Sequence, residues 1–109
     1  MKTISSQKIA QAVENLFIGC CISPSHDALC ALNAALNEET SPQGRETLRQ
    51  LLENADIAKK EQMPCCQDTG MALVFLEVGQ DVHIDGDLHA AVHTGVKNAY
   101  EKGYFRKSV

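Results

Sequence analysis

The chain has no tryptophan, only two tyrosines and three phenylalanines, and no run of basic residues. Its 14 acidic side chains outnumber 10 basic ones, for a net charge of -4. Single-stranded nucleic acid is held by stacking aromatic rings and a basic groove, and duplexes by clustered lysine and arginine. The composition therefore argues against a nucleic-acid partner.

Long apolar runs are also absent. No stretch approaches the roughly 18 residues that a membrane-spanning helix needs, and the start Met1–Ser6 lacks the apolar core and cleavage site of a secretory signal. We therefore expect no membrane association, a cytoplasmic location and reduced thiols. With 109 residues, 44% of them hydrophobic, the chain has the size and composition of one globular domain.

The five cysteines contain no Cys-x-x-Cys pair, so the spacing typical of zinc ribbons and thioredoxin-like sites is missing. They occur as Cys20-Cys21, Cys30 and Cys65-Cys66. We expect Cys20, Cys21 and Cys30 to pack in the core as small hydrophobic residues.

Hydrophobic spacing predicts an α+β fold with N-terminal helices, then a small sheet and a further helix. The expected elements are a helix over 6–21, one opening at Ser23-Pro24, and one opening at Ser41-Pro42 and extending to about residue 60. They are followed by strands over 71–78 and 82–84 and a helix from residue 88 that ends at Gly103. Gly95 within the last helix indicates close packing there.

The segment Cys65-Cys66-Gln67-Asp68-Thr69-Gly70 combines thiols, an amide, a carboxylate and a hydroxyl in one turn between helix and strand. Loops held by rigid elements often carry function. The alternative is that Asp68 and Thr69 only close the turn while one cysteine packs inside.

Other polar residues give weaker signals. His89 and His93 have helical spacing but no accompanying glutamate of the metalloprotease pattern, which favours a solvated helix face. His83 is either a strand residue directed toward the turn or a structural hydrogen-bonding group. Arg106 lies in a charged C-terminal group, either as surface charge or as a carboxylate clamp.

Two motifs resemble the iron-sulfur hydro-lyases, the family of class I fumarate hydratase and L(+)-tartrate dehydratase. They are Met63-Pro64-Cys65-Cys66-Gln67-Asp68-Thr69-Gly70 and Val78-Gly79-Gln80-Asp81-Val82-His83. The resemblance covers essentially the whole chain. It implies that residues 1–109 are the N-terminal segment of the alpha subunit, or of the cluster-binding domain in single-chain members.

The resemblance also implies a [4Fe-4S] cluster that acts as a Lewis acid on the substrate hydroxyl. By position, Cys66 matches a cluster ligand, Asp68 a catalytic residue, and Gln67 and Arg106 substrate-binding residues. Cys65 stands where the family often has an aliphatic residue, and His83 and Thr69 match without an assigned role. Relatives continue beyond Arg106-Lys107-Ser108-Val109 and supply the other two ligands there, so we expect a truncated piece that is inactive alone.

Three hypotheses follow. The first is a hydro-lyase segment acting on fumarate and malate, or on L-tartrate, together with a beta subunit or C-terminal domain and as a homo-oligomer. The second is a noncatalytic module that binds a partner subunit. The third is a thiol or zinc module that uses Cys65 and Cys66.

Overall fold

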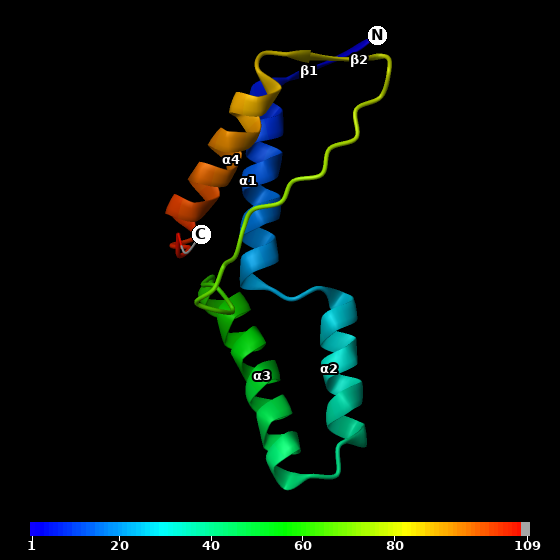
Figure 1. Ribbon diagram of the computed structural model, residues 1–109, viewed down its shortest axis with the longest axis vertical. Helices are drawn as coiled ribbons and strands as arrows, with labels where there is room; N and C mark the ends of the chain where they lie inside the picture. The colour runs from blue at the N-terminus through cyan, green and yellow to red at the C-terminus, as the bar shows by residue number, and fades with distance from the viewer. Residues whose placement is uncertain (108–109) are drawn as a thin grey trace. The chain divides into compact units, whose positions relative to one another are not determined.

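A computed structural model describes residues 1–107 of the chain. In chain order the elements are β1 (Lys2–Ser5), α1 (Ser6–Ile22), α2 (His26–Glu38), α3 (Pro42–Glu61), β2 (Val82–Asp85) and α4 (Leu88–Lys102) (Figure 1). The α+β class expected from the sequence is confirmed. The chain forms two compact units: Met1–Gly19 with the chain from Asp68 onward, and Cys20–Gln67.

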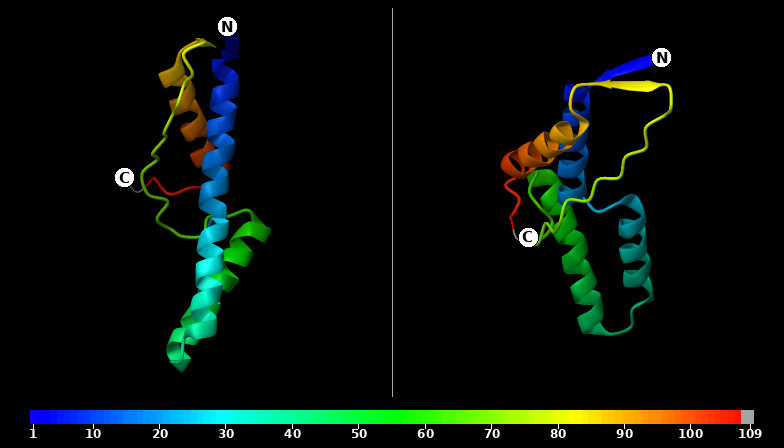
Figure 2. Two further views of the ribbon diagram at one scale, coloured as in Figure 1. Left: turned by 90° about the vertical axis from the view of Figure 1, so that its right-hand side faces the viewer. Right: turned by 45° about the horizontal axis from the view of Figure 1, so that its top comes forward.

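The Cys20–Gln67 unit is built around α2 and α3, which lie side by side (Figures 1 and 2). The Ser25 hydroxyl accepts from the Ala28 N–H, and the Ser41 hydroxyl accepts from the Gly44 N–H, so serines cap both helices. Helix α2 thus begins two residues after the predicted Ser23-Pro24 start, whereas Pro42 opens α3 as expected.

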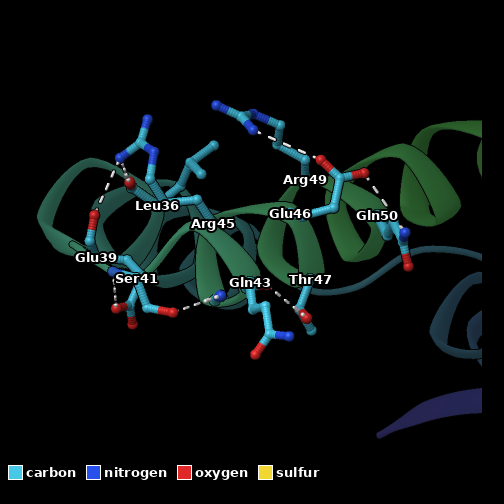
Figure 3. A network of polar contacts seen from close by, with 10 residues as sticks. Leu36, Glu39, Ser41, Gln43, Arg45, Glu46, Thr47, Arg49 and Gln50 are labelled. Atoms are coloured by element: carbon cyan, nitrogen blue, oxygen red, sulfur yellow. Dashed lines mark hydrogen bonds and ion pairs between the residues drawn. The ribbon is translucent and has the colours of Figure 1, made fainter.

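The turn between α2 and α3 is closed by Arg45. Its Nη1 donates to the carbonyl oxygens of Leu36 at 2.7 Å and Glu39 at 3.2 Å (Figure 3). These bonds satisfy carbonyl groups at the end of α2 that have no partner within the helix. At its other end α3 stops at Gln62, which has φ 54° in the left-handed region.

In the other unit, α4 lies against α1 at Gly95. A Cβ at Gly95 would lie 2.5 Å from the Ala10 carbonyl oxygen and 2.8 Å from the Val13 Cβ. The close packing predicted for Gly95 is therefore confirmed. The buried Glu14 carboxylate of α1 also forms an ion pair with Lys102 at the end of α4.

The sheet of this unit is a parallel pair, with Lys2 opposite Val82 and Ser5 opposite Asp85. The predicted strand at 82–84 is confirmed, but no sequence signal indicated that Lys2–Ser5 would be its partner. The predicted strand over 71–78 is wrong: this segment has no ladder partner among residues 1–107 and runs as extended chain (Figure 1). A strand needs a neighbour to bond its backbone, and an apolar run alone does not supply one.

Several apolar residues expected inside are exposed. Cys20 and Cys30 are exposed, and Cys21 is only half-buried, so the predicted core packing of Cys20 and Cys30 is wrong. Two large apolar residues of the helices, Leu16 of α1 and Leu51 of α3, are also exposed. The helical period predicts which face of a helix is apolar, but that face is buried only where another element packs against it. Within the described residues, none of the helices has the length and apolarity required to cross a bilayer.

Candidate active-site loop

The loop of residues 65–70 is anchored at Cys65 by two hydrogen bonds. The Cys65 N–H donates to the Cys21 carbonyl oxygen at 2.9 Å, and the Asn54 Nδ2 donates to the Cys65 carbonyl oxygen at 2.7 Å. Both backbone polar groups of Cys65 are therefore satisfied from other elements of the Cys20–Gln67 unit. The anchor fixes the backbone immediately before Cys66 and Gln67, whose side chains are exposed.

Burial and neighbouring thiolates shape the chemistry of the half-buried cysteines. Burial raises the pKa of the Cys21 thiol above its usual value, and the charges of Cys20 and Cys65 raise it further. Burial also raises the pKa of Cys65, with a smaller contribution from Cys66. Both effects disfavour the thiolate, so Cys21 and Cys65 stay protonated to higher pH than exposed thiols.

The second half of the loop, Asp68 to Gly70, is held by α4 and the segment after it. The Thr69 hydroxyl donates to the Arg106 carbonyl oxygen at 2.8 Å, and the Tyr100 hydroxyl donates to the Gly70 carbonyl oxygen at 3.0 Å. Within the loop, the Gly70 N–H donates to the Asp68 Oδ1 at 3.0 Å, and Gly70 has φ 64°. The Asp68 carboxylate thus stabilises a turn, as the simpler sequence interpretation held.

Arg106 is positioned by the residues that precede it. Helix α4 is capped at Gly103, Tyr104 has φ 56°, and the buried Phe105 packs edge-on against the Tyr100 ring at a centroid distance of 5.7 Å. Phe17 of α1 stacks on Tyr100 at 5.3 Å. The aromatic cluster of Phe17, Tyr100 and Phe105 fixes the backbone at Arg106, whose side chain is exposed.

The structure thus connects Arg106 with the turn that contains Asp68, through Thr69. Sequence reasoning named Thr69 as a residue that could close the turn and as a motif match without an assigned role, but it did not identify Arg106 as its partner. It missed Tyr100 as a supporting residue, because Tyr100 stands in the sequence only as part of an apolar stripe. A tyrosine in an apolar stripe could have indicated this supporting role, because a tyrosine hydroxyl usually finds a hydrogen-bond partner when it is buried.

The remaining polar candidates are three histidines at the surface. His83 on β2 and both His89 and His93 on α4 are exposed. In residues 1–107 no three His, Cys, Asp or Glu side chains are arranged to hold a metal ion. A cluster held by three thiolates therefore does not fit the described residues alone, and the zinc hypothesis finds no ligand set there.

Comparison with known proteins agrees with the resemblance. The family model described as fumarate hydratase (fumerase) matches residues 10–109. The putative L(+)-tartrate dehydratase subunit alpha of Methanocaldococcus jannaschii is 35% identical over 104 residues, which is 94% of this chain and 36% of that protein. The aerobic class I fumarate hydratase of Escherichia coli is 36% identical over 87 residues, 80% of this chain and 16% of that enzyme. The chain thus spans about a third or less of these relatives, and it belongs to the fumarate hydratase (fumerase) family.

Proposed function

We propose that residues 1–109 form the N-terminal segment of the catalytic domain or alpha subunit of a hydro-lyase that interconverts fumarate and malate. L-tartrate dehydration is the alternative within the same class, since relatives bear both names. The observation that carries the proposal is the Thr69–Arg106 hydrogen bond, which holds a basic residue beside the Asp68 turn. We place the enzyme in the cytoplasm.

Arg106 is suited to bind a substrate carboxylate. Its planar guanidinium offers paired donors that match two carboxylate oxygens, and its backbone is fixed by Phe105 and Thr69. The guanidinium bound to that carboxylate would stabilise the negative charge that builds on it when a proton leaves the adjacent carbon.

We assign Asp68 to positioning or protonating the leaving oxygen, and Gln67 to a hydrogen bond with the substrate. Gln67 directly precedes Asp68, so the two side chains act from one short stretch of loop. The Gly70 N–H holds one oxygen of the Asp68 carboxylate and thereby fixes its orientation.

We also assign to Cys66 one thiolate ligand of a [4Fe-4S] cluster. It is exposed and follows the doubly anchored Cys65. Because the described residues do not form a ligand set, the other ligands must come from additional polypeptide. The same holds for the remaining acid-base group, which we expect from a beta subunit or C-terminal domain.

Activity can be tested with a chimera in which this chain replaces the matched segment of the E. coli aerobic class I enzyme. We expect the isolated chain to be helical and catalytically inactive. The chimera, prepared anaerobically, should hydrate fumarate or dehydrate tartrate. A folded chimera with normal iron content that does neither contradicts the proposal, as does fumarate hydration by the isolated chain.

A second candidate function, binding of a partner polypeptide, is favoured by the exposed segment of residues 71–78. Phe75 is 91% and Leu73 70% exposed there, although both are strongly apolar. The segment borders a shallow apolar groove of about 200 Å³ lined by residues that include Ile4, Ile9, Leu76, Val82 and Leu88.

The sheet gives the same indication. Parallel sheets are normally covered on both faces, and a two-stranded sheet is marginal alone. Exposed apolar chain beside such a small sheet is typical of a polypeptide-binding surface. We therefore propose that the polypeptide that completes the enzyme covers residues 71–78.

Two substitutions of equally exposed leucines test this binding. Leu73→Ser should weaken association with the unmatched remainder of the E. coli enzyme, measured by analytical ultracentrifugation. Leu16→Ser, also at a leucine that is 70% exposed, is the matched control on α1. Equal association of the two variants would argue against the segment as the contact surface.

A further inference from the structure

Two cysteines far apart in the sequence are neighbours in the Cys20–Gln67 unit. Cys21 is at the end of α1, Cys65 is in the loop after α3, and the Cys65 N–H donates to the Cys21 carbonyl oxygen at 2.9 Å. The bond lengths on either side of this single hydrogen bond keep the two α-carbons within roughly 7 Å of each other. A disulfide usually spans about 4.4 to 6.8 Å between α-carbons.

The pair is held in place from both sides. The Asn54 side chain bonds the Cys65 carbonyl oxygen, and the Met63 N–H bonds the Ala58 carbonyl oxygen where α3 ends. Cys21 follows the regular backbone of α1. The backbone around both cysteines is therefore held by hydrogen bonds, and a disulfide between them would form by rotation of the two side chains.

The adjacent cysteines are poorer alternatives. Cys20-Cys21 and Cys65-Cys66 each have α-carbons about 3.8 Å apart, as any neighbours across a trans peptide do. That separation is below the usual range for a disulfide, so bridging neighbours requires strain. The structure contains no cis peptide bond among residues 1–107.

We propose that Cys21 and Cys65 form a reversible disulfide by exchange with a low-molecular-weight disulfide such as oxidised glutathione. One of the two thiols, through the minor fraction that is ionised, attacks the small disulfide, forms a mixed disulfide and releases one small thiol. The second cysteine then attacks the protein sulfur of the mixed disulfide and releases the other small thiol. The protein loses two protons and two electrons, which the two released thiols carry away.

The bond joins the end of α1 to the loop immediately before Cys66. It makes the mobility of that loop depend on thiol redox conditions. Both sulfurs are reduced in the structure, which is therefore the open state of the pair. This inference needs only the two thiols and their geometry, so it stands or falls separately from the hydro-lyase proposal.

The test is disulfide mapping of the complete 109-residue chain after incubation with oxidised glutathione. Trypsin leaves Cys21 and Cys65 on different peptides, because Arg45, Arg49 and two lysines lie between them. We expect the main product to be these two peptides linked through Cys21 and Cys65. Reduction with dithiothreitol should release them.

Four serine variants test the pairing: two remove a proposed partner, and two at the neighbouring cysteines are matched controls. Cys21→Ser and Cys65→Ser should abolish the linked peptide, whereas Cys20→Ser and Cys66→Ser should retain it. Separate glutathione adducts on Cys21 and Cys65, or a bridge between neighbouring cysteines, would overturn the proposal. The map of the unaltered chain decides the question even if a variant fails to fold.

Discussion

The Thr69 hydroxyl donates to the Arg106 carbonyl oxygen at 2.8 Å, across 37 residues of sequence. This bond joins the turn that contains Asp68 to the segment after α4. The Tyr100 hydroxyl also donates to the Gly70 carbonyl oxygen. Together the two bonds hold the backbone at Asp68 and at Arg106 in a fixed relative position.

Removing this bond should reduce catalysis more than it reduces stability. Thr69→Val keeps the shape of the side chain and removes the donor, so a net loss of about 0.5 to 1.5 kcal/mol of stability is expected. We expect kcat/KM of the complete enzyme to fall at least tenfold, because Arg106 is then misplaced. Thr47→Val is the control, since Thr47 makes a similar 3.0 Å bond to the Gln43 carbonyl within α3. Similar kinetics for both valine variants would refute a positioning role for Thr69.

Cys66 and Cys65 should respond differently to serine. In the complete enzyme, Cys66→Ser should abolish activity and lower iron content, because thiolates are the preferred ligands of iron-sulfur clusters. Cys65→Ser should largely preserve both, since its backbone makes the anchoring bonds. Iron analysis and fumarate hydration measure the difference, and equal losses would show that the assigned ligand is wrong.

Gly95 and Gly19 should respond in opposite directions to alanine. Gly95→Ala forces a methyl group against Ala10 and Val13 and should destabilise the fold by about 1 to 3 kcal/mol. Gly19 lies in α1, and a methyl group added there would have no neighbouring atom within 4 Å, so Gly19→Ala should stabilise the helix by up to about 1 kcal/mol. Urea unfolding of both variants gives the two values. A neutral Gly95→Ala would contradict the close helix contact.

The raised pKa of Cys21 predicts a loss of stability at alkaline pH. The folded state keeps this thiol protonated to higher pH than the unfolded state does. The stabilisation is therefore complete below the unfolded pKa of about 8.5 and is lost as pH rises through the folded pKa. Cys21→Ser should flatten the alkaline limb of the plot of stability against pH, and urea unfolding at a series of pH values measures this. An unchanged alkaline limb would contradict the prediction.

Local sequence signals predicted the helices well, because their causes lie within a few residues. Ser41-Pro42 opens α3 and Gly103 ends α4 as expected, and the α4 start expected at residue 88 is capped by Asp87. Longer-range features were not predictable in the same way. The pairing of Lys2–Ser5 with β2 and the Thr69–Arg106 bond both depend on the approach of distant segments.

Residues 71–78 also show that a prediction from local sequence fails where the structure depends on a distant segment. Their composition suits a buried strand, yet whether they form one depends on a neighbouring strand, which is absent from residues 1–107. Cys66, Asp68 and Arg106 are proposed as site residues from family motifs, and their roles stay predictions.

Arg106 provides the most direct test of the hydro-lyase proposal. Loss of one partner of a desolvated charge pair typically costs about 2 to 5 kcal/mol, so Arg106→Ala should lower kcat/KM roughly 30-fold to several thousand-fold. Arg106→Lys should be intermediate, because lysine keeps the charge and loses the paired donors.

The measurement is steady-state kinetics of both variants in the complete enzyme, with iron content matched beforehand. The proposal predicts the order wild type, Arg106→Lys, Arg106→Ala in decreasing kcat/KM. If Arg106 is only surface charge, its loss should change stability by less than about 1 kcal/mol and leave kinetics nearly unchanged. Near wild-type kcat/KM for Arg106→Ala at equal iron content would contradict the proposal.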